Sequence, residues 1–165
     1  MSKMIRCPLA FRPTLACLLA LALAPAVQAR NISHMLPVAV PLAQARASDG
    51  VADIDFAFGS ASARGAEVVG GVASVQGIGL PPLKPHGGEP IDDEVCQNAL
   101  RDALQRLAQA ARKAGGHAVV GIVGTYNGIT IDDPAQVECR MGESRAVMPL
   151  SGVIVKSLPA AAAAK

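Results

Sequence analysis

Aromatic residues are scarce in this chain of 165 residues, which has no Trp, one Tyr and three Phe. So few rings cannot build a stacking surface for nucleic-acid bases. The formal charge of +2 gives no electrostatic reason to expect nucleic-acid binding either. The hydrophobic fraction of 51% owes much to 31 alanines, so we expect one domain with a modest core and exclude a multidomain enzyme.

Long hydrophobic runs are also absent. No uncharged apolar stretch reaches the roughly 18–20 residues of a membrane span, so we expect no integral membrane protein. The most apolar segment, Leu15 to Ala24, is shorter and follows three basic residues, Lys3, Arg6 and Arg12. A basic start followed by a short apolar centre is typical of a secretory signal peptide.

The end of this segment predicts cleavage. Small residues stand three and one before the bond between Ala29 and Arg30, so residues 1–29 are predicted to be a signal peptide and the mature chain to be periplasmic or secreted. An uncleaved membrane anchor is one alternative. Lipidation at Cys17 is another, although seven more apolar residues follow that cysteine. Removing residues 1–29 leaves 12 basic and 13 acidic residues, a net charge of −1.

Cleavage would also remove two of the four cysteines. Cys96 and Cys139 remain, and an even pair in an oxidising compartment predicts one disulfide. It would close a loop of roughly 43 residues and contribute about 4 kcal/mol to stability in the chain-entropy treatment. Two free thiols or a shared metal are the alternatives. The absence of Cys-x-x-Cys argues against a thioredoxin-type redox centre.

One amphipathic helix is predicted between Pro90 and Gly115. Apolar residues recur there at spacings of three and four and place Cys96 on the buried stripe, in the first turn. Asp92 or Asp93 is predicted to cap its start, and Gly115 to end it in the left-handed conformation.

Four segments predict strands: 51–58 by alternation, 67–76 by β-branched residues, 117–126 as a continuous apolar run, and 146–156 with Pro149 or Gly152 at a bulge or edge. The fold class is therefore α+β, in the order β-β-α-β-β, with one helix on a small antiparallel or mixed sheet.

The remaining segments are predicted to be connections. Residues 30–50 form an irregular N-terminal arm, and a Gly/Pro-rich loop spans 77–90 inside a single domain covering 51–157. A turn at Asn127-Gly128 leads into a polar connection over 129–145. The alanine-rich residues 158–165 are predicted to be a disordered tail.

No constellation for catalysis or metal binding emerges. His34, His86 and His117 lack metal-ligand spacing, and Asp92-Asp93-Glu94 is explained more simply by the helix start than by a cation or an acid/base pair. Asp132-Asp133-Pro134 is typical of a turn. The serines lack a nucleophile elbow. Cys139 with His117 as a nucleophile, and a metal on His86, His117 or the thiols, are weaker alternatives.

A family resemblance rests on Cys96, Ala99-Leu100, Leu104, Ala111, Ala114-Gly115, Ala118-Val119-Val120, Ile122 and Glu138-Cys139. This pattern resembles a group of small exported bacterial proteins often labelled excinuclease ATPase subunit. It covers about residues 91–155 and is most specific over 96–139. The helix ending in Gly, followed by Ala-Val-Val, is also similar at the fold level to the YbjQ-type heavy-metal-binding fold and the RcsF-like envelope-stress lipoproteins.

The excinuclease label can be tested against the residues. An excision ATPase needs a phosphate loop ending in Gly-Lys-Ser/Thr, and cysteine sets for zinc. This chain has no Gly-Lys pair, and two cysteines follow the predicted cleavage point. Neither ATPase nor excinuclease activity is therefore expected.

The sequence thus favours an exported, non-enzymatic envelope protein that binds or senses a partner. We expect no cofactor, no nucleic acid and no membrane span after signal removal, with an unidentified envelope protein as partner. The alternative is a YbjQ-like oligomer that binds a ligand or metal, and an enzyme is the third hypothesis.

Overall fold

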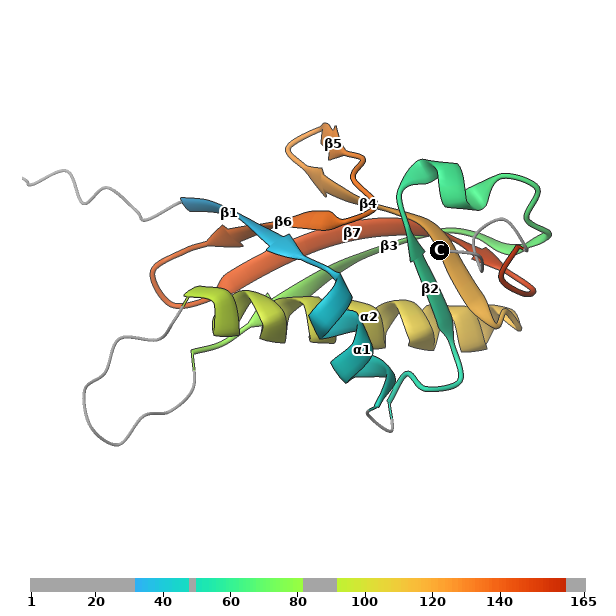
Figure 1. The fold of residues 1–165 in the computed structure, drawn as a ribbon, viewed down its shortest axis with the longest axis horizontal. Helices are drawn as coiled ribbons and strands as arrows, with labels where there is room; N and C mark the ends of the chain where they lie inside the picture. The colour runs from blue at the N-terminus through green and yellow to red at the C-terminus, as the bar shows by residue number, and fades with distance from the viewer. Residues whose placement is uncertain (1–31, 48–49, 82–91, 160–165) are drawn as a thin grey trace, which may run out of the picture.

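The computed structural model describes residues 32–47, 50–81 and 92–159, and its fold is α+β with two α-helices and a seven-stranded mixed sheet (Figure 1). The elements in chain order are β1 (Ile32–Pro37), α1 (Ala39–Arg46), β2 (Asp55–Phe58), the 3-10 turn η3 (Ser60–Ala63), β3 (Val68–Gly79), α2 (Asp92–Ala114), β4 (Ala118–Tyr126), β5 (Ile129–Ile131), β6 (Gln136–Met141) and β7 (Ala146–Val155).

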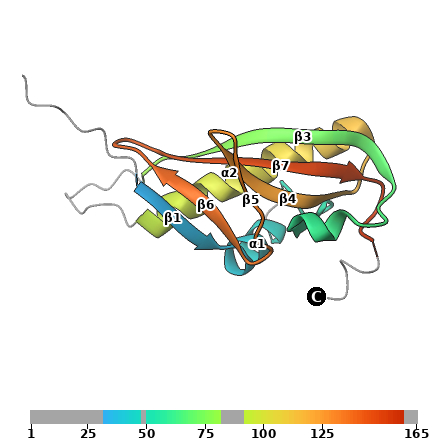
Figure 2. The same cartoon turned by 90° about the horizontal axis from the view of Figure 1, so that it is seen from above.

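Strand β7 is the centre of the sheet. It pairs with β3 along one side, and on its other side with β6 near its start and with β4 over the remainder. Beyond these, β1 pairs with β6 and β2 runs parallel to β4. Figure 2 shows the outcome from above, with β3 along one long margin of the sheet and β1 on the opposite side.

Helix α2 lies along one face of this sheet and makes most of the core. Its stripe from Val95 to Ala111 is buried against β3, β7 and the smaller helix α1, as the spacing of three and four predicts. A second, smaller cluster of Ala118, Val120 and Val155 lies apart from it, packed with Ala57, Ala63 and Leu158 among others. None of the helices in the described ranges is both long and apolar enough to cross a membrane.

Most of the predicted elements of the second half are confirmed. The helix ends at Ala114, and Gly115 follows with a φ of +74°. The turn at Asn127-Gly128 has positive φ at both residues, which joins β4 to β5 as a tight hairpin. Pro149 lies where β7 passes from its β6 pairing to its β4 pairing, so its missing N–H interrupts neither ladder.

Several predictions about the connections are wrong. The arm over 30–50 is not irregular, because residues 32–37 form β1 and residues 39–46 form α1. The connection over 129–145 contains β5 and β6. Strand β3 extends to Gly79, two residues beyond the predicted start of the loop; the rest of that loop, from residue 82, lies outside the described residues. The order β-β-α-β-β was therefore three strands and one helix short.

The strand predicted over 51–58 is half as long as expected. Its first half is a turn in which Val51 and Ile54 are buried. Ile54 continues the alternation of Phe56 and Phe58, although its backbone is not extended. Arg112 closes this turn onto α2 by binding Asp53 and the carbonyl of Gly50. The Arg112 guanidinium, which donates hydrogen bonds to the Asp53 carboxylate, lowers the pKa of Asp53 from 3.8 to about 2.

Candidate functional site

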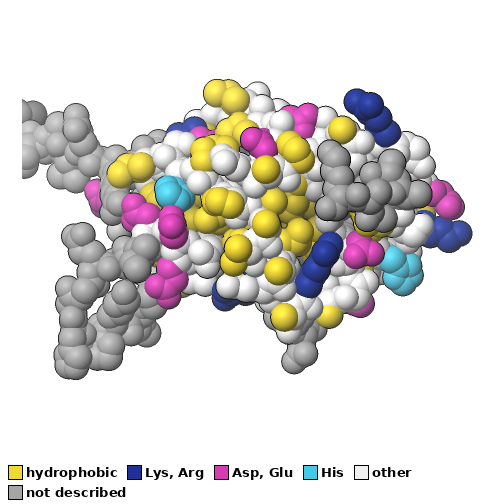
Figure 3. All heavy atoms as spheres, viewed as in Figure 1, with side chains coloured by type: hydrophobic (Ala, Val, Ile, Leu, Met, Phe, Trp, Pro, Cys, Tyr) yellow, Lys and Arg dark blue, Asp and Glu magenta, His cyan; other side chains and the backbone are white. Residues whose placement is uncertain are grey.

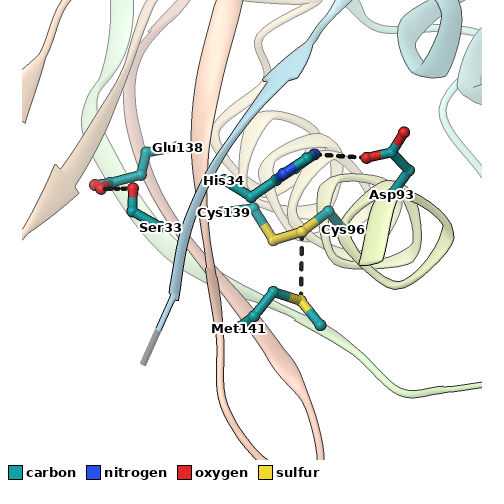
Figure 4. The surroundings of a disulfide bond; sticks show 7 residues. All are labelled: Ser33, His34, Asp93, Cys96, Glu138, Cys139 and Met141. Atoms are coloured by element: carbon teal, nitrogen blue, oxygen red, sulfur yellow. Dashed lines mark hydrogen bonds and ion pairs between the residues drawn. A yellow bond between two sulfur atoms is a disulfide. The ribbon is translucent and has the colours of Figure 1, made fainter. Parts of the chain in front are cut away.

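The predicted disulfide is present. Cys96, in the first turns of α2, is bonded to Cys139 of β6, with an S–S distance of 2.02 Å and a Cα–Cα distance of 5.8 Å. Both residues are fully buried. Because Cys96 faces the sheet from the start of the helix, only a strand at that end of the sheet can supply the partner, and β6 is that strand (Figure 4).

Two further contacts surround this bond. Met141 places its Sδ 3.5 Å from the Sγ of Cys96 and helps to seal the sulfurs from water. On β1, His34 lies opposite Cys139 in register, and its Nε2 is 2.6 Å from an oxygen of Asp93. The start of α2 is therefore joined to β6 covalently and to β1 through a polar contact (Figure 4).

The adjacent side chains of β6 form a polar cluster. Glu138 is 8% exposed and accepts a hydrogen bond from Ser33. Arg140 places a guanidinium nitrogen 2.7 Å from Glu138 and stacks its charge over the ring of Tyr126, 4.5 Å from the centroid. The buried carboxylate is thus compensated, which gives this cluster a structural role in holding β1, β6 and the β4–β5 hairpin together.

The other candidate residues are dispersed. Cys139 is in the disulfide, so it has no free thiol to act as a nucleophile with His117. The side chain of His117 is exposed. Asp133 accepts from the backbone N–H groups of Ala135 and Gln136, which confirms the predicted turn chemistry. Asp92 and Asp93 are the first two residues of α2, where their negative charge suits the positive end of the helix dipole.

The structure adds nothing for the predicted metal ligands or for the predicted cleavage point. Within the described part of the chain, no group of three His, Cys, Asp or Glu side chains is arranged to hold a metal ion. His86 and the predicted cleavage point at Ala29 and Arg30 lie outside the described residues.

A groove lies between β3 and α2, and we call it the β3–α2 groove. It consists of two adjoining hollows of about 650 and 460 Å³ that share Ser74 and Val75. Arg106, Gln109 and Arg145 line the first hollow. Ala110, Lys113 and Ala114 line the second, which is more apolar.

Glycines let the helix approach β3 this closely. A Cβ at Gly77 would lie 2.0 Å from the carbonyl oxygen of Ala99, and one at Gly79 would lie 1.9 Å from that of Val95. Neither position can therefore carry a side chain unless α2 moves away. The helix backbone rests directly on the strand, and its polar side chains reach past the strand's margin.

The outer margin of β3 is a free sheet edge. Among the described residues β3 pairs with β7 alone, so alternate residues direct their backbone groups away from the sheet. The N–H of Ile78 belongs to this outward set, because it donates to a carboxylate oxygen of Asp102 at 2.8 Å. By alternation, the N–H and C=O groups of Val72, Ser74 and Gln76 point the same way.

Among the described residues, the three charged side chains that line the groove are all positive. Arg106 is held by Asp102, with 2.9 Å between its Nε and the carboxylate. Lys113 and Arg145 make no ion pair with any described residue. Asp102, Arg106, Gln109 and Lys113 follow one another at spacings of four, three and four, so they form a single row on α2 beside the strand edge.

Sequence reasoning missed this groove. Arg106, Gln109 and Lys113 lie off the apolar stripe of the helix, and the sequence contains no sign of which strand would keep a free edge. The pattern Gly77-x-Gly79 was a usable clue, because alternate glycines on one face of a strand indicate the close approach of another backbone.

Exposed apolar side chains also lie away from the groove, around β1 and α1. Figure 3 shows hydrophobic side chains gathered around β1, α1 and the neighbouring strands. Ile32, Met35 and Val40 are the exposed large hydrophobic residues of these two elements.

Comparison with protein-family models, with curated proteins and with solved structures gives no match to this chain. Any functional conclusion therefore depends on the residues and geometry described above.

Proposed function

We propose that this chain is an exported, non-enzymatic protein of the bacterial envelope that binds a partner protein through the β3–α2 groove. The observation that carries the proposal is the free edge of β3, twelve residues long and without any charged residue or proline. Soluble proteins usually protect such an edge with charges, prolines or bulges, because an exposed edge pairs readily with other chains.

Among the described residues, the edge is protected only at its two ends, by the bulge between Val68 and Gly71 and by Asp102, which accepts a hydrogen bond from the N–H of Ile78. Val72 is 69% exposed, although a β-branched apolar side chain gains by burial. A partner seated in the groove would cover this side chain and satisfy the outward backbone groups beside it.

Export is supported by the residues and by the disulfide. A basic start, a short apolar centre and small residues before the predicted cut make up the three-part pattern of a signal peptide. A buried disulfide that joins the main helix to the sheet is typical of a protein that folds in an oxidising compartment.

The first experiment tests export. The complete chain is expressed in a bacterium with a periplasm, the cells are fractionated, and free thiols are alkylated before mass analysis. We expect a periplasmic product that has lost residues 1–29 and does not react with the alkylating agent. Intact precursor in the cytoplasm with alkylated Cys96 and Cys139 would reject the export part of the proposal.

The second experiment tests binding at the groove. A photo-crosslinking amino acid is placed at Gln109 in the groove and, as a control, at Arg101, an exposed residue of the same helix that does not line it. We expect a discrete crosslinked species in living cells from position 109 alone, lost when Ser74 is changed to Pro. Equal crosslinking from both positions, or none, would reject the groove as the binding surface.

A further inference from the structure

We propose that the β3–α2 groove takes an extended acidic peptide segment, which adds to the sheet as a strand beside β3. This inference rests on the proposed function and names the kind of partner it requires. Addition of a strand at an exposed edge is a general mode of peptide recognition, in which main-chain hydrogen bonds provide affinity and side-chain contacts provide selectivity.

The backbone of β3 supplies the main-chain part. Val72, Ser74 and Gln76 present outward N–H and C=O groups over a straight part of the strand, between the bulge at Val68/Gly71 and the contact at Ile78. Asp102 occupies the edge at Ile78, so an added strand would end there. This leaves room for about five residues of paired backbone.

The positive charges of the groove favour a peptide segment with negative charge. Lys113 lies at one end and Arg145 at the other, with Arg106 between them, and the first two have no carboxylate partner among the described residues. A strand with carboxylates on one face would place them toward these cations. Its opposite, apolar face would lie on the side of the sheet away from α2, beside the exposed side chains of Val72 and Ile78.

The same charges argue against a second copy of this chain as the occupant. Antiparallel pairing of two β3 edges about a twofold axis near Ser74 would bring Arg145 of one copy toward Lys113 of the other. Like charges brought together at an interface are destabilising. An acidic segment meets the same positions with opposite charge.

The test uses defined peptides on protein purified after expression of the complete chain, with the disulfide verified by mass. The probe is a fluorescein-labelled peptide of seven residues that alternates Glu and Val, and its matched control carries Lys in place of Glu. We expect the Glu peptide to bind and raise the fluorescence anisotropy, with affinity that falls as salt is added. The Lys peptide should not bind.

Two variants separate the contributions. Ser74→Pro removes an outward N–H at the centre of the edge and should weaken binding about tenfold. The double change Lys113→Gln and Arg145→Gln should weaken it about fivefold and reduce the salt dependence. Arg101→Gln changes the net charge without touching the groove and should leave affinity unchanged.

If Ser74→Pro fails to fold, strand addition can still be measured on the unchanged protein. Amide hydrogen exchange of the unchanged protein should slow at Val72, Ser74 and Gln76 when the Glu peptide is added, and remain unchanged at residues of β1. Binding without this protection would reject strand addition.

The outcomes distinguish this inference from the proposed function. If neither peptide binds, or both bind equally, while crosslinking from Gln109 persists in cells, the acidic segment is rejected and partner binding at the groove stands. If crosslinking fails as well, both are rejected. A dimer in solution that Ser74→Pro dissociates would show that a second copy is the occupant, and would also overturn the acidic segment.

Discussion

The two opposite edges of the sheet hold α2 in different ways. At the β1–β6 edge, a buried disulfide and the contact between His34 and Asp93 join the start of the helix to the strands. At the β3 edge no covalent link joins the described residues, and the helix rests on Gly77 and Gly79 with backbone against backbone. One edge is closed by bonds between side chains, and the other depends on the absence of side chains and keeps its outer margin free.

The two edges differ in how well they tolerate amino-acid substitution. A covalent link maintains its geometry when nearby residues vary, whereas a contact made by glycine and alanine leaves no room for any larger residue. The strand whose margin is exposed is therefore also the strand whose inner face is most restricted. Substitutions at either edge can measure how far each arrangement supports the helix.

The largest effect is expected from the disulfide. Cys96→Ser and Cys139→Ser should each lower the free energy of unfolding by about 4 kcal/mol, because the bond constrains a long loop of the unfolded chain. The double variant should be little worse than either single variant, since both remove one bond. Urea unfolding of the four proteins measures this, and fully additive losses would contradict a shared bond.

Gly77→Ala tests the other edge and should cost about 1–3 kcal/mol, because its Cβ would meet the carbonyl oxygen of Ala99 and force the helix outward. Ala at Gly128, where nothing lies within 4 Å, is the matched control for an added methyl, although its φ of +77° adds backbone strain. Thermal unfolding compares the two. If the Gly77 variant were as stable as the parent protein, the close contact of helix and strand would be refuted.

Asp102→Ala sharpens the view of the β3 margin. The change removes the acceptor for the N–H of Ile78 and a partner of Arg106, and should cost about 1 kcal/mol. Amide exchange at Ile78 should become faster while exchange at the β7-facing amides is retained. Unchanged protection at Ile78 would mean that Asp102 does not cover the edge.

The smallest effect is expected at the far end of α2, where Arg112 binds Asp53. Because the folded pKa of Asp53 is lowered to about 2, its contribution is fully present above pH 3.8 and is lost as the pH falls toward 2. Arg112→Gln should flatten the pH dependence of stability in this window and leave it unchanged near pH 7 apart from a constant offset. The measurement is the unfolding midpoint of both proteins between pH 2 and 5. If the midpoint of the variant still falls as steeply with pH, Arg112 is not the cause of the pH dependence.

The sequence predicted the elements whose pattern is local. The stripe of α2, the turn at Asn127-Gly128 and the run that forms β4 each follow from the spacing of neighbouring residues. The disulfide also followed, because only two cysteines remain after the predicted signal peptide and Cys96 falls on the buried stripe.

The elements that were missed depend on distant partners. β6 carries the buried charge of Glu138 and the partly buried Arg140, so its residues resemble a polar loop until Ser33 and Tyr126 are brought to them by the fold. β1 is short and ends at a proline, and its extended form is supported by the whole of β6. The groove was missed because its free edge depends on which strands pair, although Gly77-x-Gly79 already indicated the close approach of another backbone.

The glycines of β3 also define a signature by which distant relatives could be recognised. A chain that packs its helix in this way needs two glycines separated by one residue on the strand, and alanines four apart on the helix, as at Ala99 and Ala103. Few other residues at these positions would allow the helix and the strand to lie so close together. A search profile weighted on this pair of motifs, together with the two cysteines, would detect homologues whose overall identity has faded.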